Sequence, residues 1–269
     1  MIEKTPILVD NLEIPDFTFK PNIWTETFLR GLSTLDLSGI SVVELGVGSG
    51  IVGIDLIKKG IGRYIGLDID ERILPVAERN IKKSIPCSNC TIDLLKSDLL
   101  CDLDEENSFD LICGCLPQVT KPVNITLGAS DSFARYFDSQ KYSSDLNTYG
   151  LGLNESALIQ SKTKLKSDGR VVLMLSGRPG INVLNQMFEN NGFVPKVIFE
   201  KNVPQLRETT LATLVECERC GSEFHFYEDQ DCTKRISVAE AEQRRLKGID
   251  SYHKLYVIEG RVNYSRQNL

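Results

Sequence analysis

Three acidic side chains each follow an apolar run in the first part of the chain, and these are Glu44, Asp68 and Asp98. The first of them also precedes a glycine-rich turn that contains Gly46, Gly48 and Gly50. Glycines after a strand let backbone amides approach a ligand closely, and the following helix offers unpaired N–H groups. Carboxylates accept hydrogen bonds from hydroxyl, amino or ammonium groups. The spacing therefore predicts a site for a nucleotide-like ligand.

The glycines of this turn fit two nucleotide-binding templates, and the acid before them separates the two. Gly48-Ser-Gly-Ile-Val-Gly53 matches G-x-G-x-x-G, with Asp68 about twenty residues later, as in dinucleotide-binding domains. Glu44 would lie in the crevice, where a carboxylate needs a donor partner and would repel a pyrophosphate. S-adenosylmethionine offers an ammonium and a positive sulfonium there. The acid therefore favours this cofactor over a dinucleotide.

Each of the three acids is expected to bind a different part of S-adenosylmethionine. Glu44 is placed near the amino-acid end, Asp68 accepts from both ribose hydroxyls, and Asp98 accepts from the adenine amino group. The complete set of expected cofactor-binding residues is Glu44, Gly46, Gly48, Gly50, Asp68, Ile69, Asp98, Leu99 and Cys115.

Alternating strands and helices must position these side chains. After the strand that ends near Glu44, strands are predicted over 63–68, 91–96, 109–113, 170–175, 193–199, 210–217, 224–227 and 254–258. Helices are predicted over 51–59, 69–81, 152–166, 180–190 and 237–247. This order indicates an α/β fold with a doubly wound, mostly parallel seven-stranded sheet and a small C-terminal α+β extension. Such sheets bind ligands at the carboxyl ends of their strands, where the three acids fall.

The chain is expected to divide into an extended segment with a lid helix over 1–40, a cofactor-binding core over 41–218 and an extension packed on it over 219–269. Trp24, Phe28 and Leu32 share one face of the first helix, which either covers the cleft or packs as core. The long aperiodic connection over about 116–148 is either disordered or a second lid, and its aromatic content favours a lid. Those aromatic residues are Phe133, Tyr136, Phe137, Tyr142 and Tyr149.

Composition excludes several classes of partner. The 269 residues carry 31 Lys and Arg against 37 Asp and Glu, so a net charge of −6 argues against a nucleic-acid partner. No apolar run is long enough to span a membrane and no leader is evident, so we expect a cytoplasmic protein without a membrane partner. The oligomeric state stays open.

The eight cysteines are expected to be reduced thiols. Two pairs have the spacing of a metal knuckle, Cys87-Ser-Asn-Cys90 and Cys217-Glu-Arg-Cys220, and His225 and Cys232 lie near the second. A structural zinc needs four converging ligands, and the pairs lie far apart in the sequence. Unconnected thiols are therefore favoured, and no metal is expected.

The order of these motifs resembles motifs I to III of the class I methyltransferases, whose third motif corresponds to Ser97-Asp-Leu99. More specifically, Cys115–Val119, Tyr149–Leu153, Gly177–Gly180 and Met187–Phe193 resemble the methyltransferase domain of the methionine S-methyltransferases. The resemblance covers most of the chain from about Val42 onward and is nearest to the short, single-domain bacterial forms. It implies methyl transfer to the thioether sulfur of free L-methionine, which gives S-methylmethionine and S-adenosylhomocysteine.

The residues expected to act on this acceptor are Pro117, Gln118, Tyr142, Tyr149 and Arg178. The guanidinium of Arg178, just after a strand, either binds the acceptor's carboxylate or anchors its own turn. Tyr142 and Tyr149 could line the sulfonium region through cation–π contacts. For the ammonium, the candidates are Asp131, Asp138 and Asp145. Methylating a thioether releases no proton, so no general base is needed, and the two histidines, His225 and His253, are expected to be structural.

Two other functions stay open. The segment Gly114–Gln118 lacks the Asn-Pro-Pro-Tyr pattern of enzymes that methylate amide or aromatic-amine nitrogen. The first alternative is nevertheless an N-methyltransferase that acts on another small amino acid, an amine or a protein glutamine. The second is a non-catalytic nucleotide-binding module.

Overall fold

The structure, a computed structural model, describes residues 12–104, 108–120, 141–142 and 144–263. Its strands are β1 (Ser41–Leu45), β2 (Arg63–Asp68), β3 (Thr91–Lys96), β4 (Phe109–Gly114), β5 (Leu165–Ser176), β6 (Phe193–Pro204), β7 (Phe226–Tyr227), β8 (Arg235–Ile236) and β9 (Tyr252–Val262). Its helices are α1 (Ile23–Leu32), α2 (Ile51–Lys58), α3 (Leu74–Ser84), the short 3-10 helix η2 (Asp145–Tyr149), α4 (Gly152–Ser161), α5 (Ile181–Asn190), α6 (Ala212–Arg219) and α7 (Val238–Leu246).

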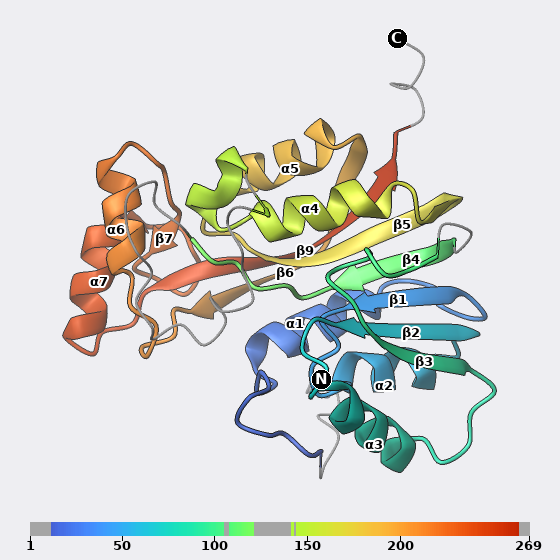
Figure 1. The fold of residues 1–269 in the computed structure, drawn as a ribbon. Coiled ribbons are helices and arrows are strands. Elements are labelled where there is room, and N and C mark those ends of the chain that lie inside the picture. Colours follow the sequence, from blue (N-terminus) through green and yellow to red (C-terminus); the bar gives the residue numbers. More distant parts are fainter. Residues whose placement is uncertain (1–11, 105–107, 121–140, 143, 264–269) are drawn as a thin grey trace.

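All these strands form one mostly parallel sheet, which Figure 1 shows with helices on both of its faces. The order is β3-β2-β1-β4-β5-β9-β7-β8, and β6 pairs with β9. Strands β1 to β5 pair in parallel, whereas β9 runs antiparallel to both β5 and β6. The predicted doubly wound α/β fold is confirmed. The predicted count of seven strands is wrong, because the described residues form nine.

One predicted strand, over 210–217, is instead the helix α6. Its buried residues are Leu214 and Cys217, which lie three positions apart and so share one face of a helix. The seventh long strand of the sheet is β9, and the two additional strands are the two-residue elements β7 and β8. The β-branched residues of this segment suggested a strand, but burial against a neighbouring helix decided its conformation.

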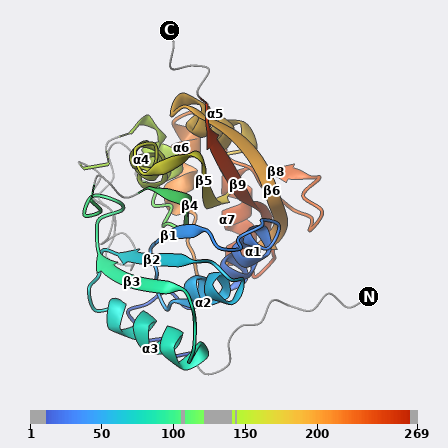
Figure 2. The same cartoon turned by 90° about the vertical axis from the view of Figure 1, so that its right-hand side faces the viewer.

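Two hydrophobic cores lie on the two faces of the sheet. One is shared with α4 and α5 and contains Leu158 and Phe188. The other is shared with α1, α2 and α3 and contains Phe28, Ile54 and Ala77. Figure 2 shows these two groups of helices on opposite faces. The sheet is therefore covered on both sides, which leaves the ends of its strands as the place for a ligand.

The first helix, α1, packs against one face of the sheet. Phe28 and Leu32 have no exposed surface, and Trp24 packs partly buried against the same core. Asn22 caps the helix by accepting from the Trp24 N–H at 2.9 Å. The stripe of apolar residues is therefore core at Phe28 and Leu32, while a covering role for Trp24 stays a prediction.

A segment between β6 and β9 stands at the carboxyl edge of the sheet. The register pairs Pro204, the last residue of β6, with Tyr252, the first residue of β9. The residues between them leave and re-enter the sheet at this edge, and they contain α6, β7, β8 and α7. Their own small core includes Leu211, Phe226 and Val238. We call residues 205–251 the edge insertion; Figure 1 shows its helices beyond the ends of β5 and β6.

The division into 1–40, 41–218 and 219–269 stays a prediction, although β9 lies inside the main sheet. Most of the predicted lid over 116–148 lies outside the described residues, including Phe133, Tyr136, Phe137, Asp131 and Asp138. Among the residues that the structure describes, no helix is both long and apolar enough to cross a bilayer.

Candidate active site

The glycine turn joins β1 to α2 in a conformation that requires glycine. Gly46, Gly48 and Gly50 have φ angles of +72°, +51° and +80°, a region that other residues rarely adopt. The N–H groups of Gly46 and Val47 donate to the carbonyl of Leu67 in β2, at 2.8 and 2.9 Å. The turn is therefore held across the ends of two parallel strands.

Glu44, at the end of β1, is buried and already has partners within the protein. Its Oε2 accepts from the Tyr64 hydroxyl at 2.5 Å, and its carboxylate also interacts with the Gly53 N–H. Burial raises the pKa of the Glu44 carboxyl to about 8, against the lowering effect of the Tyr64 hydrogen bond. The predicted need for a donor is met by Tyr64, which the sequence analysis missed.

The third glycine of the G-x-G-x-x-G match serves packing. A Cβ at Gly53 would overlap the Tyr64 hydroxyl, and a Cβ at Gly66 would lie 2.9 Å from the same oxygen. These glycines therefore make room for the ring that holds Glu44. The third glycine of the dinucleotide template also serves close packing between helix and strand, so Gly53 does not separate the two templates.

Asp68 and Ile69 lie at the carboxyl end of β2, beside the glycine turn. Asp68 accepts from the N–H groups of Gly48 and Asp70, at 3.2 and 3.1 Å. Burial raises the pKa of this carboxyl above its usual value, and the backbone donors partly offset the effect. The Ile69 side chain is 40% exposed at the same edge. This pairing of a carboxylate with an exposed apolar side chain fits a ribose and an adjoining planar base.

Asp98 and Leu99 follow β3 and contact the described end of the predicted lid. Asp98 accepts from the Tyr142 hydroxyl and forms an ion pair with Lys141. That carboxylate raises the pKa of Lys141. Leu99 has a φ of +53°, which is unusual for a residue with a side chain. Lys141 is a second neighbour that the sequence analysis missed.

Cys115, Pro117 and Gln118 follow β4 and are all partly buried. The Gln118 Oε1 accepts from the Ser176 N–H at 2.5 Å, which ties the end of β4 to the end of β5. Burial raises the pKa of the Cys115 thiol to about 12, so this group stays protonated near neutral pH. Gln118 therefore acts as a brace between two strand ends.

Tyr149 connects the predicted lid to the edge insertion. Its ring meets that of Phe224 edge to face, with 5.5 Å between centroids. Asp145 begins the same 3-10 helix, η2. The structure thus places Tyr149 against the insertion, while Tyr142 points to Asp98.

Arg178 lies just beyond β5, at the carboxyl edge. Its Nε donates to the Ser176 Oγ at 2.8 Å, and its carbonyl accepts from the His225 N–H at 2.8 Å. Burial lowers the pKa of the guanidinium to about 10. Among the described ion pairs, none includes Arg178. The residue is partly buried. A guanidinium removed from much of the solvent without a carboxylate partner is costly, so an anionic ligand would stabilise it here.

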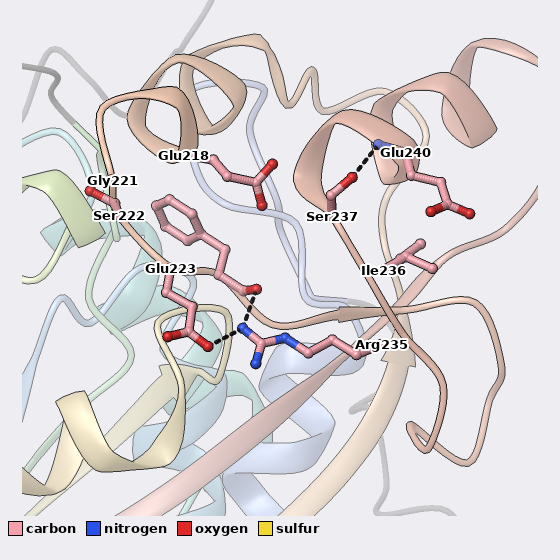
Figure 3. Close-up of a pocket in the computed structure, with 9 residues that line it drawn as sticks. Glu218, Gly221, Ser222, Glu223, Arg235, Ile236, Ser237 and Glu240 are labelled. Atoms are coloured by element: carbon pink, nitrogen blue, oxygen red, sulfur yellow. Dashed lines mark hydrogen bonds and ion pairs between the residues drawn. The ribbon is translucent and has the colours of Figure 1, made fainter.

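A separate hollow lies within the edge insertion, away from the glycine turn. It has a volume of about 540 Å³ and is lined by Glu218, Gly221, Ser222, Glu223, Phe224, Arg235, Ile236, Ser237 and Glu240. Figure 3 shows Arg235 directed to Glu223 and to the Phe224 carbonyl, at 2.6 and 3.0 Å. Glu218 accepts from the Val238 N–H at the start of α7. These charged groups hold the insertion together.

The sequence analysis missed one further polar group and named a pair of cysteines that the structure separates by burial. Asn154 in α4 has no exposed surface, and neither its Oδ1 nor its Nδ2 has a hydrogen-bond partner. Cys217 is buried in α6, whereas Cys220 is exposed at its end. Within the described ranges, no three histidine, cysteine or acidic side chains are arranged to bind a metal ion.

The residues at this edge fit S-adenosylmethionine. A Cβ added at Gly48 would meet only the Gly46 carbonyl, at 4.0 Å, so the turn leaves open space beside it. Asp68 and Asp98 stand at the ends of neighbouring strands, as a ribose and an adenine require. The individual contacts of the nine predicted cofactor-binding residues stay predictions.

Comparisons with known proteins support this interpretation. A family model described as a methyltransferase domain matches residues 42–126. Methionine S-methyltransferase from Hordeum vulgare is 29% identical over 247 residues, which cover 81% of this chain and 22% of that protein. This chain therefore corresponds to only about a fifth of the length of that relative.

Two further similarities are a short sequence match and a likeness in fold. Ribosomal protein L11 methyltransferase from Aeromonas hydrophila is 42% identical over 60 residues, covering 22% of this chain and 20% of that protein. The solved structure of precorrin-6y C5,15-methyltransferase from Geobacter metallireducens aligns with a TM-score of 0.50 and 16% identity, covering 93% of this chain and 94% of that one. The structural likeness shows the fold alone. The matched methyltransferase domain contains the glycine turn, Asp68 and Asp98, and together with the methyltransferase relatives it supports a class I, S-adenosylmethionine-dependent methyltransferase.

Proposed function

We propose that this protein methylates the thioether sulfur of free L-methionine and releases S-methylmethionine and S-adenosylhomocysteine. The relatives that align with most of the chain are named methionine S-methyltransferases, although they are much longer proteins. The observation that carries the proposal is Arg178, a partly buried cation at the carboxyl edge whose described side-chain bond is to the neutral Ser176 hydroxyl. A free amino acid supplies the carboxylate that this cation lacks.

The predicted chemistry agrees with the groups near this edge. S-adenosylmethionine supplies an electrophilic methyl group on a sulfonium. A thioether is uncharged and nucleophilic, and its methylation releases no proton, so the protein only has to orient it and exclude water. Two titratable groups near the proposed acceptor site are accordingly poor bases: burial holds the Cys115 thiol protonated and lowers the pKa of His253 to about 3.

In this proposal Arg178 binds the acceptor's carboxylate through its fork of N–H donors. The bond from its Nε to Ser176 fixes the orientation of the guanidinium, and Gln118 fixes Ser176 through its backbone N–H. Gln118 and Pro117 thus support the acceptor site from β4. Tyr142 and Tyr149 are proposed to line it, and Asp98 would fix Tyr142 by accepting from its hydroxyl.

The competing candidate is methylation of nitrogen, on a small amino acid, an amine or a protein glutamine. The short but more identical match to a ribosomal protein L11 methyltransferase favours a protein acceptor among these. The missing Asn-Pro-Pro-Tyr pattern at Gly114–Gln118 argues against it. Methyltransferase names among the relatives favour an enzyme over a binding module.

Proton release during turnover separates the two candidates. With the acceptor in weakly buffered solution, sulfur methylation is expected to release no proton for each S-adenosylhomocysteine formed. Methylation of an amine nitrogen should release about one. Stoichiometric acidification with methionine as the acceptor would therefore overturn the sulfur assignment.

A further inference from the structure

The histidine in β9 lies at the same edge of the sheet as Arg178. His253 is the second residue of β9 and is only 2% exposed. Ser176, which holds the Arg178 side chain, pairs with Leu255 in β9. The Gly177 N–H donates to the Lys254 carbonyl at 2.8 Å, so the residues next to Arg178 and His253 are joined at this edge. The positive charge of Arg178 also contributes, after burial, to the lowered pKa of His253.

One ring nitrogen of His253 is committed to the backbone. Its Nδ1 lies 3.1 Å from the carbonyl of Lys254. A carbonyl can only accept, so Nδ1 carries the proton, and Nε2 of the neutral ring presents a lone pair. The hydrogen bond thus assigns the tautomer and makes Nε2 a hydrogen-bond acceptor.

That lone pair has no described partner and keeps some contact with solvent. The fully buried, unpaired side-chain atoms among the described residues belong to Asn147, Asn154 and Gln205. Nε2 of His253 is not one of them, although it has no hydrogen-bond partner there. Buried polar groups are normally paired, so an acceptor left open at a ligand-binding edge calls for a donor.

The surroundings of the ring hold it in place. Trp24 of α1 and Phe226 of β7 face His253, with ring centroids 6.1 and 6.3 Å from it. A further acceptor lies at the same edge, on Gln205, which directly follows β6. The Gln205 N–H donates to the carbonyl of Ser251, just before β9, at 2.8 Å. The Gln205 Oε1 is buried and unpaired. Two hydrogen-bond acceptors, His253 Nε2 and Gln205 Oε1, therefore lie at the same edge of the sheet as Arg178, whose guanidinium has no described carboxylate partner.

We propose that His253 receives the ammonium group of the amino-acid acceptor through Nε2 while Arg178 binds its carboxylate. This inference rests on the proposed function and adds that the site recognises the ammonium group of the acceptor. A zwitterion offers one donor group and one acceptor group on the same carbon, which matches a neutral histidine beside a guanidinium. Acceptors that lack the α-amino group should therefore bind poorly.

Nuclear magnetic resonance of the intact protein tests this bond directly. The chain has only two histidines, so ¹⁵N-histidine labelling gives two rings, and the His225→Gln variant assigns them. In the protein saturated with S-adenosylhomocysteine, adding methionine should shift the Nε2 resonance of His253 in the direction of a hydrogen-bonded acceptor. Adding 4-(methylthio)butanoate, which lacks the ammonium, should leave that resonance in place. An unchanged resonance while methionine binds would overturn the proposal.

Kinetics with matched acceptors give the second test. His253→Phe keeps an aromatic ring between Trp24 and Phe226 but removes the lone pair, so KM for methionine should rise on the order of 10- to 100-fold. KM for 4-(methylthio)butanoate should hardly change. Arg178→Met should instead raise KM for both acceptors and spare 3-(methylthio)propylamine, which lacks the carboxylate.

The outcomes separate this inference from the proposed function. If the wild-type protein does not methylate methionine at all, the proposed function fails first. If it does, but His253→Phe raises KM equally for methionine and its des-amino analogue, the ammonium assignment alone is wrong. If His253→Phe does not fold, the magnetic resonance experiment on the wild-type protein still decides.

Discussion

At the scale of single residues, the site combines groups that the sequence indicates with groups that only the fold reveals. The three acids at strand ends were predictable, because an acid after an apolar run lies at the edge of a parallel sheet. The role of Tyr64 was not predictable, because its hydroxyl donates to Glu44 from the neighbouring strand. The space for its ring comes from the missing side chains of Gly53 and Gly66. Long-range pairs of this kind have no local signal in one sequence.

The proposed role of Asp68 in binding the cofactor gives the first prediction. Asp68→Ala should weaken binding of S-adenosylmethionine on the order of 10-fold or more, because a hydrogen bond to a charged group is lost. Calorimetry measures the affinity, and the melting temperature checks that the fold persists. Asp93, on the edge strand β3, provides a matched control as Asp93→Ala. Unchanged affinity in Asp68→Ala would remove Asp68 from the cofactor site.

The role of Arg178 gives the second prediction. Arg178→Met should raise KM for methionine about 100-fold, while KM for S-adenosylmethionine changes little, since only the carboxylate of the acceptor loses its partner. Arg178→Lys should lie between the two, because an ammonium keeps the charge and loses the fork. Equal increases for both substrates would instead indicate that Arg178 only anchors its turn.

The buried carboxyl of Glu44 gives a prediction on pH. Its pKa is raised from 4.5 to about 8 in the folded protein, chiefly by burial. Between these values the folded state binds more protons than the unfolded state, so the free energy of unfolding should fall as pH rises from about 4.5 to about 8. Denaturant titrations across this range measure the slope. Glu44→Gln keeps an acceptor for Tyr64 and should flatten it; an unchanged slope in that variant would contradict the assignment.

At the scale of elements, most strands and helices were predictable, including the short strand β7, whereas α6 and the two-residue strand β8 were not. The alternation through β1, α2, β2 and β4 follows directly from apolar runs and glycine turns. The segment that forms α6 was wrongly predicted as a strand because Thr213 and Val215 favour strands. Burial of Leu214 and Cys217 on one face stabilises a helix instead. The position of β9 between β5 and β6 is a matter of topology, which periodicity does not report.

The unpaired amide of Asn154 makes a prediction about α4. Asn154→Leu should raise the free energy of unfolding by roughly 1–2 kcal/mol, because it removes two buried polar atoms without partners. Asn80 is the matched control: its amide donates to the carbonyls of Glu13 and Ser49, at 2.8 and 2.9 Å, so Asn80→Leu should destabilise the protein. Loss of stability in both variants would mean that Asn154 has a partner in solution.

At the scale of the whole molecule, the proposed cofactor site and the proposed acceptor site lie side by side along the carboxyl edge of one sheet. The residues proposed to bind the cofactor lie at or just after the ends of β1, β2 and β3, and those proposed to bind the acceptor lie just after the ends of β4 and β5 and at the start of β9. The edge insertion adds Phe226 and Phe224 to this second region. The sequence could indicate the first region from motifs, but the second only through resemblance, because its residues come from distant segments.

The most direct test of the central claim is mass spectrometry of the protein incubated with S-adenosylmethionine and the twenty common amino acids. The account predicts a new ion at the mass of methionine plus one methyl group, with S-adenosylhomocysteine formed in equal amount. The same mixture without methionine should give no methylated product. If methionine stays unchanged while another component gains a methyl group, the cofactor site stands and the acceptor assigned to Arg178 is wrong.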